Sequence, residues 1–532
     1  MAISRITVFI LVVPALAFGQ NRYFVSFKDK TNSPYSISNP LQFLSQKSID
    51  RRSRENFVTT AEDFPVNTAY VQQVKATGAS VFFTSRWFNG VLVQTSASTA
   101  NTISTLPFVT QVELVAYGTR LTGGRKKSKD KFEQAKSSST QQNQVQSQMI
   151  GVDKMQAAGF HGEGIDVAVF DGGFIGANTL SAFQALYREG RLKSTFNFVK
   201  NIADVYSDHW HGTEVLSIMA GNLPAYLGGI DKANFYLYET EDVSTEYRVE
   251  EYNWAFAAER ADSIGVDVIN SSLGYNTFDD PTMDYTYQNL DGKTAISSQA
   301  ARKAVQRGIV VVSSAGNEGN NPWQYIDVPA DAEGVVACGS VDDSSVRSPF
   351  SSIGPTSDGR IKPDVDAVGS GAVVITSDGI ISTNYGTSFS SPLIACLATG
   401  LRQSLPKSTS QEIYYRIIKS ASQATRPDDY LGYGIPNFTG AFELLNFTDE
   451  FELYPNPISN GQLKIIFKNP QDQPVNILVY SMTGQSLLNL TDSISWSKNP
   501  YPVDFSLFSP GIYFVKVQTP TSSKTLRVVR IN

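Results

Sequence analysis

Cysteine and histidine are scarce in this chain of 532 residues, which has two cysteines and three histidines. Two cysteines cannot build the disulfide framework of a small secreted scaffold. Both lie in apolar surroundings, Cys338 between Val335 and Gly339 and Cys396 between Leu393 and Leu397. We therefore expect two buried thiols that act as small apolar side chains, and neither a disulfide bridge nor a cysteine nucleophile.

Long apolar segments and concentrated positive charge are also missing. Residues 1–19 carry one arginine and an apolar stretch that ends at Ala17-Phe18-Gly19. This pattern predicts a secretory signal peptide, cut near Gly19 or Gln20 and too short to span a membrane. No later segment approaches about 20 apolar residues, so we expect a soluble exported protein. The net charge of -6 gives no basic face for nucleic acid, and the cationic run Arg125-Lys126-Lys127 indicates a solvated linker.

Changes in composition and in the spacing of apolar residues divide the rest of the chain into four parts. Residues 20–117 alternate short strands with helical stretches, which predicts a small α+β domain of split βαβ character. Residues 118–144 are polar and predict a disordered, cleavable linker. Residues 145–446 alternate apolar strands with helices, which predicts a doubly wound, mostly parallel α/β sheet. Residues 451–532 show period-two segments and predict a C-terminal β-sandwich.

Two segments of the α/β part offer an acid and a base. The strand 165–171 ends at Asp171, followed by two glycines that allow a sharp turn, although an aspartate that merely starts a turn is the more frequent explanation. His211 opens an apolar helix, where an imidazole can face a cleft and act as a base. His161 lies in a glycine-flanked loop. We expect His209 to be a solvent-exposed loop residue, with a contact to His211 as the alternative.

Two further segments offer a nucleophile and a hydrogen-bond donor. Ser388 opens an apolar helix after Gly386 and Thr387, and its backbone N–H would point at a developing oxyanion. A serine or threonine helix cap explains the same pattern. Asn317 follows the strand 310–314 in a glycine turn, where an amide either donates to an oxyanion or simply occupies the turn.

The four segments together resemble the subtilisin-like serine proteases, in which aspartate, histidine and serine follow one another in this order. The similarity runs over about residues 148–445 and includes the segments 267–274, 361–365 and 432–437. Two departures are Glu214, where the family often has histidine, and Phe389-Ser390, where it often has Met-Ala. We expect neither position to bear a catalytic role.

The resemblance implies a secreted serine endopeptidase that is made as a zymogen. Asp171 would orient the base His211, and Ser388 would be the nucleophile. Asn317 would donate to the oxyanion. The residues implied to bind substrate are Ser272, Leu273, Gly274, Ser314, Ala315 and Gly316. Pro329 is similar to a proline beside the family's specificity pocket, and counting back from it places Asp327 near the floor of that pocket. A carboxylate there favours Lys or Arg before the scissile bond. A surface position for Asp327 is the alternative.

The flanking parts also resemble known domains. Residues 20–117 are similar to subtilase propeptides, which act as folding chaperones and inhibitors; a permanent N-terminal domain is the alternative. The C-terminal part is similar to the sorting domains of type IX secretion in Bacteroidota, with a carbohydrate-binding β module as the alternative. Its motifs are Tyr454-Pro455-Asn456-Pro457, Met482-Thr483-Gly484 and Gly511-Ile512-Tyr513. The implied partners are protein or peptide substrates, the chain's own propeptide and the type IX machinery, and the implied location is outside the cell or on its outer surface.

The implied mechanism requires no cofactor. Relatives often carry structural calcium, and Asp279, Asp280 and Asp284 offer carboxylates, although their spacing matches no defined calcium loop. Two other functions remain open. One is a catalytically inactive surface or adhesion protein on the same scaffold, and the other is an esterase or peptide ligase that uses the same triad.

Overall fold

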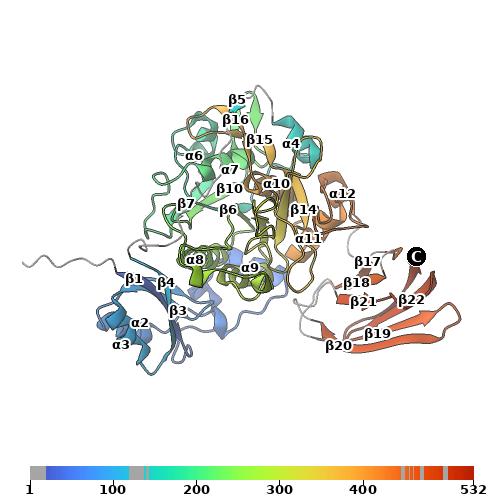
Figure 1. The fold of residues 1–532 in the computed structure, drawn as a ribbon, viewed down its shortest axis with the longest axis horizontal. Helices are drawn as coiled ribbons and strands as arrows, with labels where there is room; N and C mark the ends of the chain where they lie inside the picture. The colour runs from blue at the N-terminus through green and yellow to red at the C-terminus, as the bar shows by residue number, and fades with distance from the viewer. Residues whose placement is uncertain are drawn as a thin grey trace, which may run out of the picture.

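The computed structural model describes residues 20–118, 137–138, 143–444, 450–454, 456–458, 461–467, 473–494 and 501–531. The expected signal peptide and most of the expected polar linker, including Arg125-Lys126-Lys127, lie outside the described residues, and so does Pro455. Figure 1 shows three parts: an N-terminal part in blue, a large central part, and a C-terminal part in red.

The N-terminal part is a four-stranded antiparallel sheet, in the order β2-β3-β1-β4, with helices on one face. Val25, Val91 and Val93 of the sheet pack against Val74 of α2 and Ile103 of α3. This α+β architecture was predicted. The elements are β1 (Asn21–Phe27), α1 (Gln46–Arg54), α2 (Thr68–Ala76), β2 (Ser80–Ser85), β3 (Gly90–Thr95), α3 (Ala97–Ser104) and β4 (Val109–Ala116), with short 3-10 helices at Pro40–Gln42 and Ala61–Asp63.

The central part is built on a seven-stranded sheet in which every paired strand runs parallel. Its strand order is β14-β13-β12-β11-β6-β10-β7. Successive side chains of β6 enter different hydrophobic clusters, Val167 and Val169 on one face and Ala168 and Phe170 on the other. Burial of both faces explains the unbroken apolar runs. The strands are β6 (Asp166–Asp171), β7 (Leu192–Asn197), β10 (Asn234–Glu239), β11 (Val268–Ser271), β12 (Val310–Ser314), β13 (Val336–Val341) and β14 (Val365–Val368).

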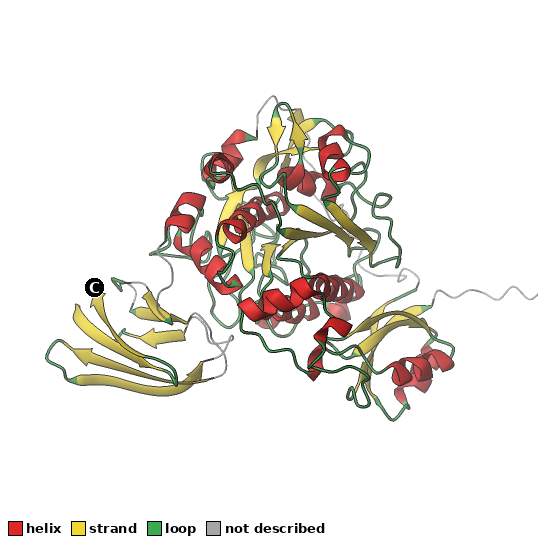
Figure 2. Ribbon diagram, turned by 180° about the vertical axis from the view of Figure 1, so that it is seen from behind, coloured by secondary structure: helices red, strands yellow, loops and turns green. Residues whose placement is uncertain are grey.

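Helices cover both faces of this sheet, as the rear view in Figure 2 also shows. Side chains of α7 and α10 belong to the cluster on one face, and those of α8 and α9 to the cluster on the other. This is the predicted doubly wound arrangement. The helices are α4 (Gln144–Met149), α5 (Val152–Ala157), α6 (Gln184–Arg188), α7 (His211–Ala220), α8 (Val249–Ile264), α9 (Ile296–Gln306), α10 (Thr387–Ser404), α11 (Ser410–Lys419) and α12 (Phe438–Glu443), with 3-10 helices at Ser181–Phe183, Pro281–Met283 and Tyr287–Asn289.

A small antiparallel sheet lies beside α7 and leads into α10. It consists of β15 (Ser370–Ile375), β16 (Ile381–Tyr385) and, from the far end of the expected linker, β5 (Ser137–Ser138). A hairpin of β8 (Asn222–Leu223) and β9 (Tyr226–Leu227) follows α7. These antiparallel strands were not predicted from the sequence.

The C-terminal part consists of a three-stranded and a four-stranded antiparallel sheet around one hydrophobic cluster, as predicted for a β-sandwich. The first sheet has the order β17-β18-β21 and the second β20-β19-β22-β23. The strands are β17 (Phe451–Tyr454), β18 (Gln462–Phe467), β19 (Gln473–Ser481), β20 (Ser486–Ile494), β21 (Tyr501–Asp504), β22 (Gly511–Gln518) and β23 (Ser523–Arg530).

The N-terminal sheet docks on α8 and α9 through an apolar face and a buried ionic cluster. Phe24 stacks on Tyr252 with ring centroids 4.3 Å apart, and both belong to the hydrophobic cluster of the central part. Beside them, the carboxylate of Asp262 on α8 pairs with Arg51, Arg52 and Arg86 of the N-terminal part. Asp262 is fully buried. This cluster was not predicted from the sequence, since the arginines lie 176 to 211 residues before Asp262.

Candidate active site

Asp171 and His211 meet at the carboxyl edge of the parallel sheet. Asp171 ends β6 and is fully buried, and its Oδ1 lies 2.8 Å from Nδ1 of His211, the first residue of α7. The backbone N–H of Gly172 also donates to this Oδ1, at 2.8 Å. A Cβ on Gly212 would lie 2.5 Å from the carbonyl oxygen of Gly173, so glycine permits the close approach of α7 to the turn after β6.

A second carboxyl group, that of Glu239, lies on the strand next to Asp171. Glu239 ends β10 and is the Cα partner of Asp171 across the neighbouring strands. Burial, followed by the hydrogen bond to Asp208, raises the pKa of Glu239 to about 10. Glu239 is therefore protonated at neutral pH and adds no second negative charge next to the carboxylate of Asp171.

The other two histidines differ in their distance from this pair. His209 is 8% exposed, and its Nδ1 accepts a hydrogen bond from the backbone N–H of His211 at 3.2 Å. The expectation that His209 is a solvent-exposed loop residue is therefore wrong, because the loop folds back against the start of α7. His161 is elsewhere, with Nδ1 2.8 Å from Asp231.

Ser388 lies in the first turn of α10, next to the same edge of the sheet. Gly386, which precedes the helix, has a φ of +144°, a conformation that favours glycine. The Ser388 hydroxyl donates to the backbone carbonyl of Ser272 at 3.3 Å, and the Ser272 hydroxyl donates to the carbonyl of Ser388 at 2.9 Å. The ring of the next residue, Phe389, lies 5.4 Å from the His211 ring, centroid to centroid, so α7 and α10 start side by side.

Asn317 contacts the start of α10. Its Oδ1 accepts from the backbone N–H of Thr387 at 2.9 Å and from the Thr387 hydroxyl at 3.1 Å. A Cβ on Gly386 would lie 3.7 Å from Asn317 Nδ2. Because the carbonyl end of the amide is occupied, the amino end is the one that lies near Gly386, two residues before Ser388. In the sequence, Thr387 was considered only as a possible helix cap, and its contact with Asn317 was not predicted.

The segments implied to bind substrate lie opposite each other around Asp327. The hydroxyl of Ser314 donates to the carbonyl of Leu273 at 3.4 Å, and the N–H of Asp327 donates to the carbonyl of Ala315 at 2.9 Å. A Cβ on Gly274 would lie 2.7 Å from the Cβ of Asp327, and one on Gly316 would lie 2.3 Å from its Oδ2. Asp327 is 6% exposed, so the alternative surface position is wrong.

The aspartates considered for calcium act as backbone caps. Oδ1 of Asp280 accepts from the N–H of Thr282 at 3.0 Å, and Oδ1 of Asp284 accepts from the N–H of Phe278 at 2.7 Å. Oδ2 of Asp279 accepts from the N–H of Glu246 at 3.2 Å. Nearby, ligand oxygens of the buried residues Glu241, Glu246 and Glu250 lie within 4.8 Å of one another, a spacing that suits a cation. Calcium binding stays a prediction.

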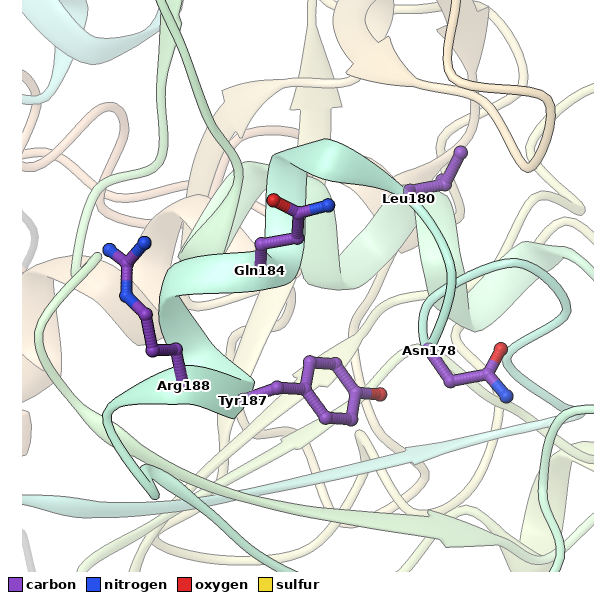
Figure 3. Close-up of a pocket in the computed structure, with 5 residues that line it drawn as sticks. All are labelled: Asn178, Leu180, Gln184, Tyr187 and Arg188. Carbon is purple, nitrogen blue, oxygen red and sulfur yellow. The ribbon is translucent and has the colours of Figure 1, made fainter.

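A separate pocket of about 280 Å³ lies beside α6. Its lining residues are Asn178, Leu180, Gln184, Tyr187 and Arg188. Figure 3 shows the Arg188 side chain pointing away from Tyr187 and Asn178. None of the expected catalytic or substrate-binding residues lines this pocket. Both cysteines are buried and free, as predicted.

A carboxylate, an imidazole and a hydroxyl thus lie at the carboxyl edge of a wound parallel sheet, the edge at which open α/β sheets bind their ligands. The family model described as "Subtilase family" matches residues 162–434. The chain belongs to the subtilase family and is a subtilisin-like serine endopeptidase. Residues 22–135 match a "Peptidase S8 propeptide domain, Bacteroidota", and residues 452–532 match a "Secretion system C-terminal sorting domain".

Known proteins share the central part in particular. Subtilisin DY of Bacillus licheniformis is 29% identical over 298 residues, which are 55% of this chain and 96% of that protein. Subtilisin E of Bacillus subtilis is 28% identical over 307 residues, which are 56% of this chain and 72% of that protein. The solved structure of the epidermin leader peptide processing serine protease from Staphylococcus aureus has a TM-score of 0.55 at 15% identity and covers 80% of this chain and 100% of its own.

The propeptide domain identifies the protein as a zymogen. The sorting domain indicates type IX secretion to the outside of the cell or to its outer surface. In the described part of the chain, no helix is both long enough and apolar enough to cross a membrane.

Proposed function

We propose that this protein hydrolyses peptide bonds through a Ser388-His211-Asp171 triad and an acyl-enzyme. His211 takes the hydroxyl proton of Ser388 as its Oγ attacks the carbonyl carbon, and then delivers that proton to the leaving amine. Asp171 holds the proton on Nδ1, so that Nε2 is the basic nitrogen, and it stabilises the imidazolium. The observation that carries the proposal is the 2.8 Å contact between buried Asp171 and His211, beside the serine at the start of α10.

The tetrahedral intermediate would be stabilised by two donors. One is Nδ2 of Asn317, whose carbonyl end is held by Thr387. The other is the backbone N–H of Ser388, since the first N–H groups of a helix have no acceptor within the helix. The positive end of the α10 dipole adds to this stabilisation. The mechanism uses no metal or cofactor.

The substrate class we propose is extended peptides with Lys or Arg before the scissile bond. The carboxylate of Asp327 lies between Gly274 and Gly316, where the absence of side chains leaves it next to the backbone of both substrate-binding segments. A buried carboxylate at this position favours a cationic side chain. Asn276 Nδ2 donates to Oδ1 of Asp327 at 2.6 Å and orients the group.

The N-terminal part would inhibit the enzyme until the linker is cut. Tyr117, at its end, donates to Asp280 at 3.0 Å, and β5 pairs with β16, the strand that leads to Ser388. The described ends of the linker are therefore held at two separate places in the central part. N-terminal sequencing of the secreted protein tests this point, since a start near residue 21 would show that the N-terminal part is retained.

Labelling with a fluorophosphonate probe, followed by mass mapping, tests the triad. The secreted full-length protein should be labelled on Ser388, and Ser388→Ala should abolish both the labelling and the cleavage of a peptide mixture. Absence of label on the processed wild-type protein would support the inactive scaffold instead. Labelling without peptide cleavage, but with hydrolysis of ester substrates, would support the esterase.

A further inference from the structure

One hydrogen bond connects the helix that begins with His211 to the strand that leads into Ser388. Nδ2 of Asn384 donates to Oε2 of Glu214 at 2.7 Å, between residues 170 positions apart in the chain. Glu214 lies one turn after His211 on α7, and Asn384 lies on β16, four residues before Ser388. Both side chains are buried, at 1% and 3% exposure.

The amide of Asn384 is fixed at both ends. Its Oδ1 accepts from the backbone N–H of Tyr385 at 2.8 Å, so its amino group must be the end that faces α7. Only a hydrogen-bond acceptor at position 214 can satisfy that donor. The carboxyl group of Glu214 is such an acceptor, and it lies in the first turn of α7.

A second contact joins the same helix to the same hairpin. The backbone N–H of Ile375 on β15 donates to the hydroxyl of Ser217 on α7 at 2.9 Å. Ser217 and Glu214 are three residues apart and thus on one face of the helix. Each strand of the β15–β16 hairpin therefore has one hydrogen bond to α7. The bond between Glu214 and Asn384 is the one nearer to His211 and Ser388 along the chain.

We infer that Glu214 and Asn384 are positioning residues that fix the distance between His211 and Ser388. The base and the nucleophile are on different elements, and their approach depends on how the first turn of α7 sits against the turn between β16 and α10. A displacement of about 1 Å costs on the order of 100-fold in rate when reacting groups must be aligned. The inference rests on the proposed triad and adds two residues that would act through the placement of the triad.

The test is an exchange of the amide and the carboxylate. Asn384→Asp removes the donor and places two carboxylates against each other, and we expect kcat to fall about 10- to 100-fold with KM within about twofold. In the double variant E214Q/N384D, the amide introduced on α7 supplies the donor to the new carboxylate on β16, and kcat should return to within about threefold of wild type. The rate of fluorophosphonate labelling of Ser388 should follow kcat.

The matched control is the pair of Asn234 and Asp166, in which an asparagine amide also donates to a buried carboxylate, at 2.8 Å. Asp166 is at the opposite end of β6 from Asp171. Asn234→Asp also sets a second carboxylate against the first, although Lys47 pairs with the other oxygen of Asp166 at 2.8 Å. It should lower thermal stability while leaving kcat and the labelling rate within about twofold of wild type. If N384D does not accumulate as folded protein, Glu214→Met removes the acceptor with little change in side-chain length and carries the same expectation.

Wild-type kcat in N384D or E214M would overturn the inference, and so would failure of the exchange to restore kcat. An equal loss of kcat in N234D would also overturn it, because the effect would then be general destabilisation. Lack of label on wild-type Ser388 is a different result, since it contradicts the proposed function itself.

Discussion

Oδ1 of Asp171 lies 2.8 Å from Nδ1 of His211, and both groups are almost completely shielded from solvent. This contact selects the tautomer in which the second ring nitrogen can accept a proton. Asp171→Asn should therefore lower kcat about 10,000-fold, since an amide can stabilise the wrong tautomer and cannot stabilise the imidazolium. Single-turnover kinetics on a peptide ester would check this. A loss below tenfold would contradict the role assigned to Asp171.

Asn317 offers a second prediction, on the oxyanion. Asn317→Leu removes Nδ2 with little change in volume, and kcat should fall about 100- to 1,000-fold with little change in KM, as for the corresponding donor of a subtilisin. The measurement is kcat and KM on one peptide substrate, with a thermal melt to show that the protein is folded. A change confined to KM would argue against an oxyanion donor.

Asp327 should determine which peptides are cut. In Asp327→Asn the pocket loses its charge but keeps its shape, and kcat/KM for peptides with Arg or Lys before the cleaved bond should fall at least tenfold relative to peptides with Leu at that position. Cleavage of a peptide library followed by mass spectrometry measures this ratio. Equal cleavage after Arg and Leu by the wild-type protein would refute the specificity.

The buried carboxyl group of Asp366 should make the stability of the folded protein depend on pH in an unusual way. It lies in β14, and neither carboxylate oxygen has a hydrogen-bond partner among the described residues. Burial raises the pKa of Asp366 well above its ordinary value of 3.8. The folded state thus binds this proton more tightly than the unfolded state, and the stability it contributes is present below pH 3.8 and is lost as the pH rises toward the raised pKa.

Asp366→Asn should remove this dependence, so its melting temperature should exceed that of the parent protein by a margin that is larger at pH 8 than at pH 5. Thermal melts on a Ser388→Ala background avoid self-digestion. Asp364→Asn is the control, because Asp364 Oδ2 accepts from the buried Lys362 at 2.6 Å and its loss should destabilise at both pH values. An Asp366→Asn protein that melts lower at pH 8 would contradict the account.

Asp262 should decide how tightly the N-terminal part is held. Burial raises the pKa of Asp262, but Arg86, Arg52 and Arg51 outweigh this and lower it below 3.8. Asp262→Asn leaves buried arginines without their anion and should weaken the docking by about 3–5 kcal/mol. After cleavage of the linker, the two fragments should co-elute in size-exclusion chromatography for the parent protein and separate for the variant.

The control for that experiment is Glu113→Gln, since the pair of Glu113 and Arg248 is about a quarter exposed and 3.7 Å apart. Loss of such a pair should cost less than about 1 kcal/mol. Because the folded pKa of Asp262 is depressed, its contribution is present above pH 3.8 and is lost as the pH falls below that value. Docking that strengthens under acidic conditions would contradict the ionic cluster.

The amino-acid sequence alone determined the α/β class, the approximate helices and strands, and the order of the residues assigned to the triad. These properties are local, because the apolar period of a strand or helix and a glycine turn are encoded within about ten residues. The expected strand 165–171, for example, differs from β6 by one residue at its start.

Only the tertiary structure decided which distant groups meet. It buried His209 against the start of α7, placed Asp327 between Gly274 and Gly316, joined Glu214 to Asn384, and gathered three arginines around Asp262. Such contacts depend on how the crossover helices return each strand to the sheet and on how one domain packs on another. No local pattern records either, which is why the hydrogen bond between Glu214 and the strand that leads into Ser388 was not predicted.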